Sequence, residues 1–220
     1  ERCMIKLLKE LCLINGTSGD EVLVRNAIIE KIKDFCEYRV DNLGNLICFC
    51  KGKKSAEKKL MIAAHMDEVG FIVTYINEDG TLCFSEVGGI DTSVVLGRQV
   101  KVGNDGISGV VGSTAIHNLS KEQRETPPKY GDMYIDIGAS SKEEAEKYVS
   151  LGDLICFDSE FVELGGNCIK SKAIDDRAGC TAMIQLIREG VEYDTYFVFN
   201  VQEEVGLRGS MVSAFSVAPD

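Results

Sequence analysis

Apolar residues recur every three or four positions in two stretches near the start of the chain, residues 4–11 and 24–35. This spacing places them on one face of a helix and predicts two helices. The segment "NGTSGDE" lies between them, with Ser18 followed three residues later by Glu21. A serine and a glutamate at that spacing are typical of a capping box, so we expect the second helix to begin there.

Three strand-like runs follow, "EYRV", "LICFC" and the apolar run "LMIAA" at residues 60–64, which we expect to be a buried strand. From residue 71 to residue 164, short alternating runs are separated by turn residues, as in "FIVTYI", "TLCFSE", "RQVKV" and "GISGVVGS". Many short strands with frequent turns predict a small β-barrel or sandwich. Ser141 and the acidic residues after it predict a single short helix within this part.

The α/β pattern resumes after residue 164, with a helix near residues 178–187, the apolar strand "TYFVFNV" and a helix from Ser210. The fold class we predict is therefore α/β: a mixed-sheet domain interrupted by a β-rich insert. We expect residues 1–70 and 165–220 to form the two parts of the α/β domain and residues 71–164 to form the insert.

The 220 residues carry 35 acidic and 24 basic side chains, a formal net charge of −11. A strongly acidic protein repels phosphate backbones and anionic lipid, which argues against nucleic acid and membrane partners. The apolar runs are too short for a spanning helix. Nine cysteines are scattered without a CxxC pair, and this odd number without a signal peptide predicts reduced thiols in the cytoplasm.

Polar groups follow three of the predicted apolar segments. His65 and Asp67 follow "LMIAA", Asp175 and Asp176 follow "IKSKAI", and Glu203 and Glu204 follow "TYFVFNV". Ligands in open α/β sheets bind beyond the carboxyl ends of the strands, so these groups can converge on one site.

His65 and Asp67 lie on the same side of an extended chain, so Asp67 can accept a proton from one ring nitrogen while the other binds a metal. A lone histidine paired with an acid is the simpler alternative. Neighbouring Glu203 and Glu204 can divide two tasks, metal binding and proton transfer, or form the acidic start of a solvated loop. Asp175 and Asp176 can cap the helix that begins there, or one of the two carboxylates can bridge two cations.

Together, "AHMDEVG", "AIDDRAG" and "QEEVG" closely resemble the glutamyl-aminopeptidase family of dinuclear metallopeptidases, the tetrahedral or deblocking aminopeptidases, some of whose members are described as endoglucanases. The resemblance implies a metal-dependent aminopeptidase that removes N-terminal residues from peptides by means of a metal-activated water. It implies that His65 binds one metal, Asp175 bridges both and Glu204 binds the second. It further implies that Glu203 is the general base and that Asp67 orients the histidine.

The resemblance also implies two divalent metal ions, with zinc or cobalt favoured and manganese or magnesium compatible with the oxygen-rich ligands. It implies short peptide substrates and a dimer-based homo-oligomer, up to a dodecamer, assembled through the insert. Asp176 is expected to follow Asp175 across an unusual, cis peptide bond. One more aspartate and one more histidine are expected downstream of Asp220, so we expect the catalytic domain to be C-terminally incomplete in this chain.

Two other functions fit parts of the pattern. A glycoside hydrolase needs two carboxylates and no metal, whereas this set includes a histidine and a bridging aspartate. A non-catalytic assembly or binding homologue would keep the fold without turnover. The second histidine, His117, has no acid two residues away and is expected to be a surface residue of the insert.

Overall fold

The computed structural model describes all residues except 1, 56, 119, 122–124 and 127. The chain divides into two compact units. The α/β unit consists of Glu1–Glu68 with Glu160–Asp220, and the barrel unit consists of Val69–Ser159. None of the helices in the described residues is long and apolar enough to cross a membrane.

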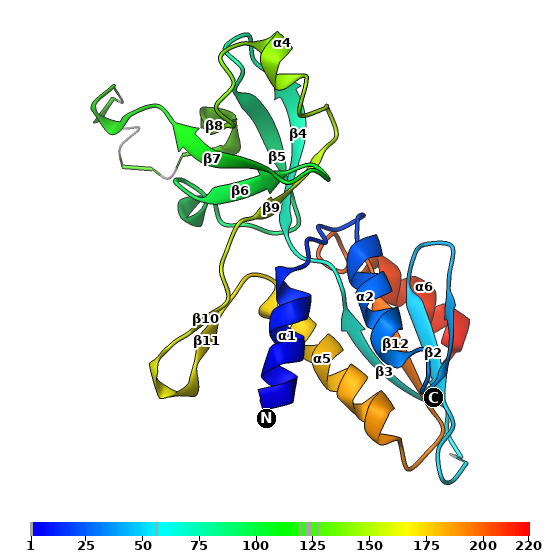
Figure 1. Ribbon diagram of the computed structural model, residues 1–220. Coiled ribbons are helices and arrows are strands. Elements are labelled where there is room, and N and C mark those ends of the chain that lie inside the picture. The colour runs from blue at the N-terminus through cyan, green and yellow to red at the C-terminus, as the bar shows by residue number, and fades with distance from the viewer. Residues whose placement is uncertain (1, 56, 119, 122–124, 127) are drawn as a thin grey trace. The chain divides into compact units, whose positions relative to one another are not determined.

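The helices and the four strands of the main sheet in the α/β unit follow the predicted order (Figure 1), and three short elements between residues 162 and 170 were not predicted. They are α1 (Arg2–Leu13), α2 (Val22–Ile32), β1 (Glu37–Val40), β2 (Leu46–Cys50), β3 (Leu60–His65), β10 (Val162–Glu163), the 3-10 turn η4 (Gly165–Asn167), β11 (Ile169–Lys170), α5 (Ile174–Glu189), β12 (Thr195–Asn200) and α6 (Arg208–Val217).

The main sheet of this unit has the strand order β1-β2-β12-β3. Strand β12 is antiparallel to β2 and parallel to β3, so the sheet is mixed, as predicted. In the parallel pair, Asn200 is the register partner of His65. The carboxyl ends of β3 and β12 therefore reach the same edge of the sheet, where His65 meets the turn that follows Asn200.

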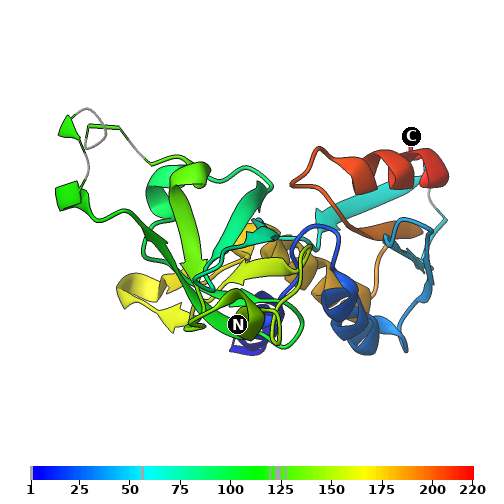
Figure 2. The same cartoon turned by 90° about the horizontal axis from the view of Figure 1, so that it is seen from above.

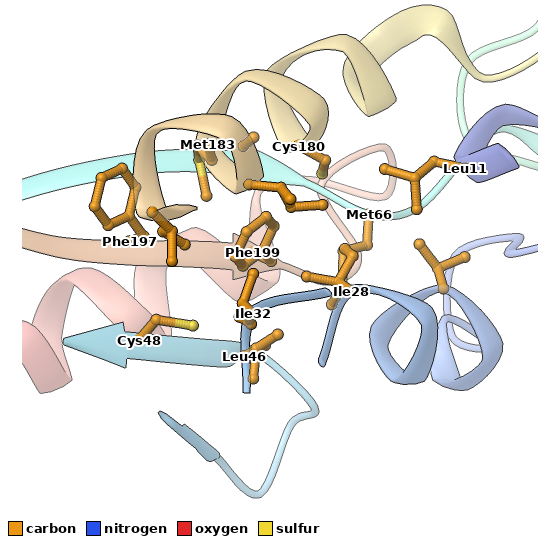
Figure 3. Close-up of a cluster of buried hydrophobic side chains, with 14 of the residues drawn as sticks. Leu11, Ile28, Ile32, Leu46, Cys48, Met66, Cys180, Met183, Phe197 and Phe199 are labelled. Atoms are coloured by element: carbon orange, nitrogen blue, oxygen red, sulfur yellow. The ribbon is translucent and has the colours of Figure 1, made fainter. Parts of the chain in front are cut away.

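Helices cover both faces of this sheet. Figure 2 shows α6 on one side of β3 and β12, with α2 and α5 on the other. The larger core packs α1, α2 and α5 against the sheet and includes Leu11, Ile28, Met183, Phe197 and Phe199 (Figure 3). A smaller cluster of Ile47, Val198 and Val217 lies on the α6 side. Burying both faces fixes the central strand β12, whose last residues lead into the candidate site.

Two expectations about local structure are wrong. The run at residues 60–64 is not a buried strand, because β3 lies at the edge of the described sheet and leaves Leu60 and Ile62 about 40% exposed (40% and 41%). The capping box at Ser18 and Glu21 does not form either, since Glu21 is the N-cap residue of α2 and makes no side-chain capping bond. The side chains of Ser18 and Glu21 have other partners, described below.

The barrel unit is a closed barrel in the order β4-β5-β8-β7-β6-β9. Its elements are β4 (Gly70–Ile76), β5 (Leu82–Val87), η1 (Thr92–Val94), β6 (Gln99–Val102), β7 (Ile107–Ser113), η2 (Ile116–Asn118), η3 (Tyr130–Asp132), β8 (Met133–Asp136), α4 (Lys142–Ala145) and β9 (Leu154–Phe157). The predicted short helix is confirmed, because Ser141 caps α4 by accepting a hydrogen bond from the Glu144 amide. Aromatic rings from different strands, including Phe71, Phe84 and Phe157, meet edge to face in the interior.

Candidate metal centre at the carboxyl edge of the sheet

Three predicted site residues converge where β3 and β12 end. His65, Glu203 and Glu204 each offer one ligand atom, and these three atoms lie within 4.8 Å of one another. His65 is the last residue of β3, and the two glutamates follow the end of β12 at Asn200 after Val201 and Gln202. The histidine is buried and the glutamates are half-buried. The parallel pairing of the two strands thus brings together His65 and Glu203, which are 138 positions apart in the sequence.

Asp175 approaches the same imidazole from α5. Its Oδ1 lies 3.2 Å from Nε2 of His65, and Oε2 of Glu203 lies 3.9 Å from that nitrogen. The Asp175 side chain is 90% exposed and lies outside the compact three-residue group. The peptide bond between Asp175 and Asp176 is cis, as expected. Asp176 accepts a hydrogen bond from the Gly179 amide at 2.9 Å and so stabilises the start of the regular helix.

The other ring nitrogen of His65 faces Asp67. Nδ1 lies 3.1 Å from the backbone carbonyl of Asp67 and 3.4 Å from its carboxylate. Burial alone lowers the pKa of His65, but hydrogen bonding and attraction to Asp67, with Glu203 and Asp175, outweigh burial and raise the pKa to about 9. The site therefore favours positive charge at the imidazole.

The Asp67 carboxylate also has three hydrogen-bond donors besides the ring. It accepts from the Ser18 hydroxyl at 2.6 Å, the Glu203 amide at 3.0 Å and the Glu204 amide at 3.1 Å. Burial raises the pKa of this carboxyl, but His65, Ser18 and the two amides together hold it below its ordinary value. Asp67 is fully buried. It fixes the backbone of both glutamates as well as contacting His65.

Ser18 and Glu21 are site residues that the sequence interpretation missed. Glu21 is 4% exposed, and its Oε1 accepts from the Gly19 amide at 2.8 Å and the Gln202 amide at 3.0 Å. Gln202 adopts a left-handed backbone conformation with φ of 52°, which is uncommon for a residue with a side chain. The loop before α2 therefore holds the turn before Glu203. A Ser-x-x-Glu pattern looks the same whether the two side chains cap a helix or hydrogen-bond to distant residues such as Asp67 and Gln202. The sequence therefore carries no signal that distinguishes these two roles.

A second buried network supports the chain on the other side of His65. The Arg177 side chain is fully buried and donates from Nε to the Met66 carbonyl at 2.7 Å and from Nη1 to the Leu11 carbonyl at 2.6 Å. Nζ of Lys172 donates to Oε1 of Glu68 at 2.5 Å. Arg177 thus joins α1 and α5 to the residue that follows His65.

The donor set suits a divalent cation. Imidazole and carboxylate are borderline and hard ligands, the combination that zinc and similar ions take in proteins. Burial raises the pKa of Glu204, the carboxylates of Asp67, Glu203 and Asp175 raise it further, and His65 opposes them. A cation at this place would supply positive charge where carboxylates crowd together. The residues present therefore fit the metal that the sequence pattern predicts.

Comparisons with known proteins identify the family of the chain. A family model described as M42 glutamyl aminopeptidase matches residues 44–220. A putative aminopeptidase of Acetivibrio thermocellus is 47% identical over all of this chain, which spans 64% of that protein. The chain thus spans less than two thirds of that curated relative.

Solved structures are also similar. The TET1 peptidase of Pyrococcus horikoshii, described as assembling into a tetrahedron or a large octahedral shell, gives a TM-score of 0.87 at 39% identity, over 99% of this chain and 66% of that one. A Thermotoga maritima protein named endoglucanase gives 0.80 at 43% identity, over 96% of this chain and 62% of that one. The matched family model covers well over half of the sequence, so the chain belongs to the M42 glutamyl aminopeptidase family.

Proposed function

We propose that this chain carries the larger part of a metal-dependent aminopeptidase that removes N-terminal residues from short peptides. The observation that carries the proposal is the convergence of His65, Glu203 and Glu204 within 4.8 Å at the carboxyl edge of a parallel strand pair. Membership of the M42 family supports the same activity.

We assign the metal-binding role to His65, Asp175 and Glu204. Asp175 is suited to a bridging position because its exposed carboxylate already lies 3.2 Å from the imidazole. Two bound divalent ions would acidify the attacking water and polarise the scissile carbonyl. Zinc or cobalt fits the imidazole and carboxylate ligands best, and manganese or magnesium suits the oxygen-rich part of the set.

Glu203 is the proposed general base. Its carboxylate lies beside His65, and its backbone is fixed by Asp67. In this role it takes a proton from the attacking water and passes it to the departing amine. Asp67 is a positioning residue, because it holds the amides of both glutamates and contacts the histidine.

The test is hydrolysis of a panel of aminoacyl amides by the full-length polypeptide. The protein is stripped with a chelator and then given zinc, cobalt, manganese or magnesium in turn. We expect hydrolysis to disappear with the metal and to return with at least one of the ions. Full hydrolysis after complete metal removal would overturn the proposed mechanism.

Substituting Glu203→Gln separates the base from the ligands. We expect turnover to fall by about 10²-fold or more, the usual contribution of general acid–base catalysis, while metal binding is largely kept. Glu30→Gln is the matched control, because Glu30 makes an exposed ion pair with Lys33 and should leave both properties unchanged. Unchanged turnover in Glu203→Gln would contradict the assignment.

Glycoside hydrolysis is the alternative suggested by the endoglucanase name of one similar structure. Two carboxylates can hydrolyse a glycosidic bond without a metal. Metal-independent release of sugar from a soluble glucan would favour this alternative, and peptide hydrolysis restored by a divalent ion would exclude it as the main activity.

We further propose that the α/β unit is catalytic and that the barrel unit mediates self-association in the cytoplasm. The barrel unit exposes large apolar side chains, including Tyr75, Leu96, Val110, Tyr148 and Leu151. The tetrahedral and octahedral shells described for the similar TET1 peptidase, and the dodecamer described for the similar PhTET1-12s structure, support a homo-oligomer, up to a dodecamer. All nine cysteines are free, which suits a reducing compartment. Light scattering of the full-length protein would report a monomer if this assembly proposal is wrong.

A further inference from the structure

Three of the nine cysteines lie together in the α/β unit, away from the candidate metal centre. Cys48 and Cys50 are alternate residues of β2, so their side chains point to the same face of the sheet. Both belong to the larger core, and Figure 3 shows Cys48 among its apolar side chains. Cys36 immediately precedes β1 and packs against the same core.

Cys36 and Cys50 lie just beyond the last register pair of β1 and β2. Glu37 is the partner of Phe49 in this antiparallel pair, Cys36 directly precedes Glu37 in a bend, and Cys50 directly follows Phe49. The Cys36 thiol donates a hydrogen bond to the Ile32 carbonyl at 3.8 Å, and its sulfur packs against the same core as Cys48 and Cys50, close enough for both thiols to act on its pKa. The strand pairing and the core packing thus bring the three sulfurs together.

The end of this strand pair suits a disulfide. The ladder stops at Glu37, because the Phe35 amide donates to the Ile32 carbonyl at 2.9 Å and Cys36 lies in a bend. Facing residues of an antiparallel pair have Cα atoms about 4.5–5.5 Å apart, and a disulfide joins Cα atoms about 4.4–6.8 Å apart. Cys36 and Cys50, each one residue beyond such a pair, are therefore placed where a small movement lets their sulfurs bond.

The other two pairings fit less well. Cys48 lies two residues further along β2 and is diagonal to Cys36, and diagonal neighbours are about 7–8 Å apart, somewhat less between their Cβ atoms, against the ~3.8 Å between the Cβ atoms of a disulfide. Cys48 and Cys50 are separated by two residues of extended strand, about 6.8 Å, which is the upper limit for bridging. Cys36 with Cys50 is therefore the pair that closes with least movement.

The three thiols also differ in access and acidity. Cys48 is fully buried and Cys50 is 4% exposed, whereas Cys36 is half-buried and open to a small reagent. Hydrogen bonds from Cys48 and Cys50 lower the pKa of the Cys36 thiol, and burial acts in the opposite direction. The thiolate is the form that reacts with peroxide, so Cys36 is the sulfur that an oxidant meets first.

We propose that Cys36 and Cys50 are an oxidation site that forms a reversible disulfide when the protein meets hydrogen peroxide. The Cys36 thiolate attacks one peroxide oxygen, a sulfur–oxygen bond forms, the oxygen–oxygen bond breaks, and hydroxide leaves to be protonated to water. The Cys50 sulfur then attacks the sulfenic acid, the sulfur–sulfur bond forms and water leaves. Two thiols are oxidised and one peroxide is reduced to two waters.

The test uses the wild-type chain and peptide mapping. Trypsin places Cys36 in residues 34–39 and both other thiols in residues 40–51, so the proposed bond joins two separate peptides. After peroxide treatment, alkylation and digestion without reductant, we expect the linked pair, two hydrogens lighter than the sum of its parts and released by dithiothreitol. Fragmentation should assign the bond to Cys50.

Single substitutions identify which cysteine forms the disulfide with Cys36. Cys50→Ser should abolish the cross-link, Cys48→Ser should keep it, and Cys83→Ser, a half-buried thiol of the barrel unit, is the matched control that should change nothing. The proposal is overturned if wild-type Cys36 remains alkylatable, is recovered as sulfinic acid without a cross-link, or links chiefly to Cys48.

Discussion

Asp67 illustrates how much of the site a single buried carboxylate can organise. Its oxygens accept from Ser18, Glu203 and Glu204, while its backbone carbonyl faces the ring of His65. Charge-assisted hydrogen bonds of this kind are about twice as strong as neutral ones. The positions of His65, Glu203 and Glu204 therefore all depend on Asp67, although Asp67 itself need not touch a metal or a substrate.

Removing the Ser18 hydroxyl should loosen this arrangement. We expect Ser18→Ala to lower the free energy of unfolding by about 1.5–3 kcal/mol, because the hydrogen bond to a buried charge is lost. We expect kcat to fall with KM little changed, since the glutamate turn is misplaced and substrate contacts are kept. Ser140→Ala removes an equally short hydroxyl-to-carboxylate bond, 2.6 Å to Glu144, at an exposed position and is the matched control. Equal effects of the two variants would contradict this role for Ser18.

Glu21 should make stability depend on pH. Burial raises its pKa above the ordinary value of 4.5, against the hydrogen bonds from Gly19 and Gln202. The folded protein therefore holds this proton more tightly than the unfolded chain, and the stabilisation that the proton gives is present below pH 4.5 and lost as the pH rises through the raised pKa. The glutamine of the Glu21→Gln variant stays uncharged at every pH. The free energy of unfolding of this variant, relative to that of the wild type, should therefore rise from pH 4 to pH 8. Urea unfolding at several pH values measures this, and a constant difference would refute it.

At the scale of elements, the sequence indicated where chemistry would emerge but not what supports it. Polar residues directly after apolar strands pointed to His65 and Glu203, and the parallel pairing of β3 with β12 brings them together. The edge position of β3 could not be read from "LMIAA", because an apolar run looks the same in a central strand and an edge strand. The partners of Ser18 and Arg177 are distant in sequence, and no local pattern encodes them.

Arg177 should prove the most sensitive residue of α5. Arg177→Met leaves the carbonyls of Leu11 and Met66 buried without their donor, so we expect a loss of about 3–5 kcal/mol in unfolding free energy, as for other broken buried charged networks. Arg188→Met, at an exposed position of the same helix, is the control and should cost less than about 1 kcal/mol. Comparable losses in the two variants would show that the buried network contributes little.

At the scale of the whole molecule, alternating strand and turn residues predicted a β-rich part of the chain, because hydrophobic period and turn chemistry are local signals. The compact barrel unit is Val69–Ser159, whereas the predicted insert was 71–164. Closure of the barrel is a non-local property. It depends on β9 pairing with both β4 and β6, which no window of sequence records. The sequence accordingly left barrel and sandwich open, and the structure shows a closed barrel.

The barrel unit should fold as an isolated fragment of residues 69–159. Its core residues, Phe71, Ile135 and Ile155 among them, all come from within those limits, and β4 and β9 are neighbours, so both ends of the fragment leave from adjacent strands. We expect a cooperative thermal transition with dispersed amide signals in NMR spectra. Ile135→Ala should cost about 2–5 kcal/mol by opening a cavity, whereas Val110→Ala at a 45% exposed site should have little effect. A fragment that binds hydrophobic dye and melts without cooperativity would contradict the prediction, because it would show that the barrel unit needs the rest of the chain in order to fold.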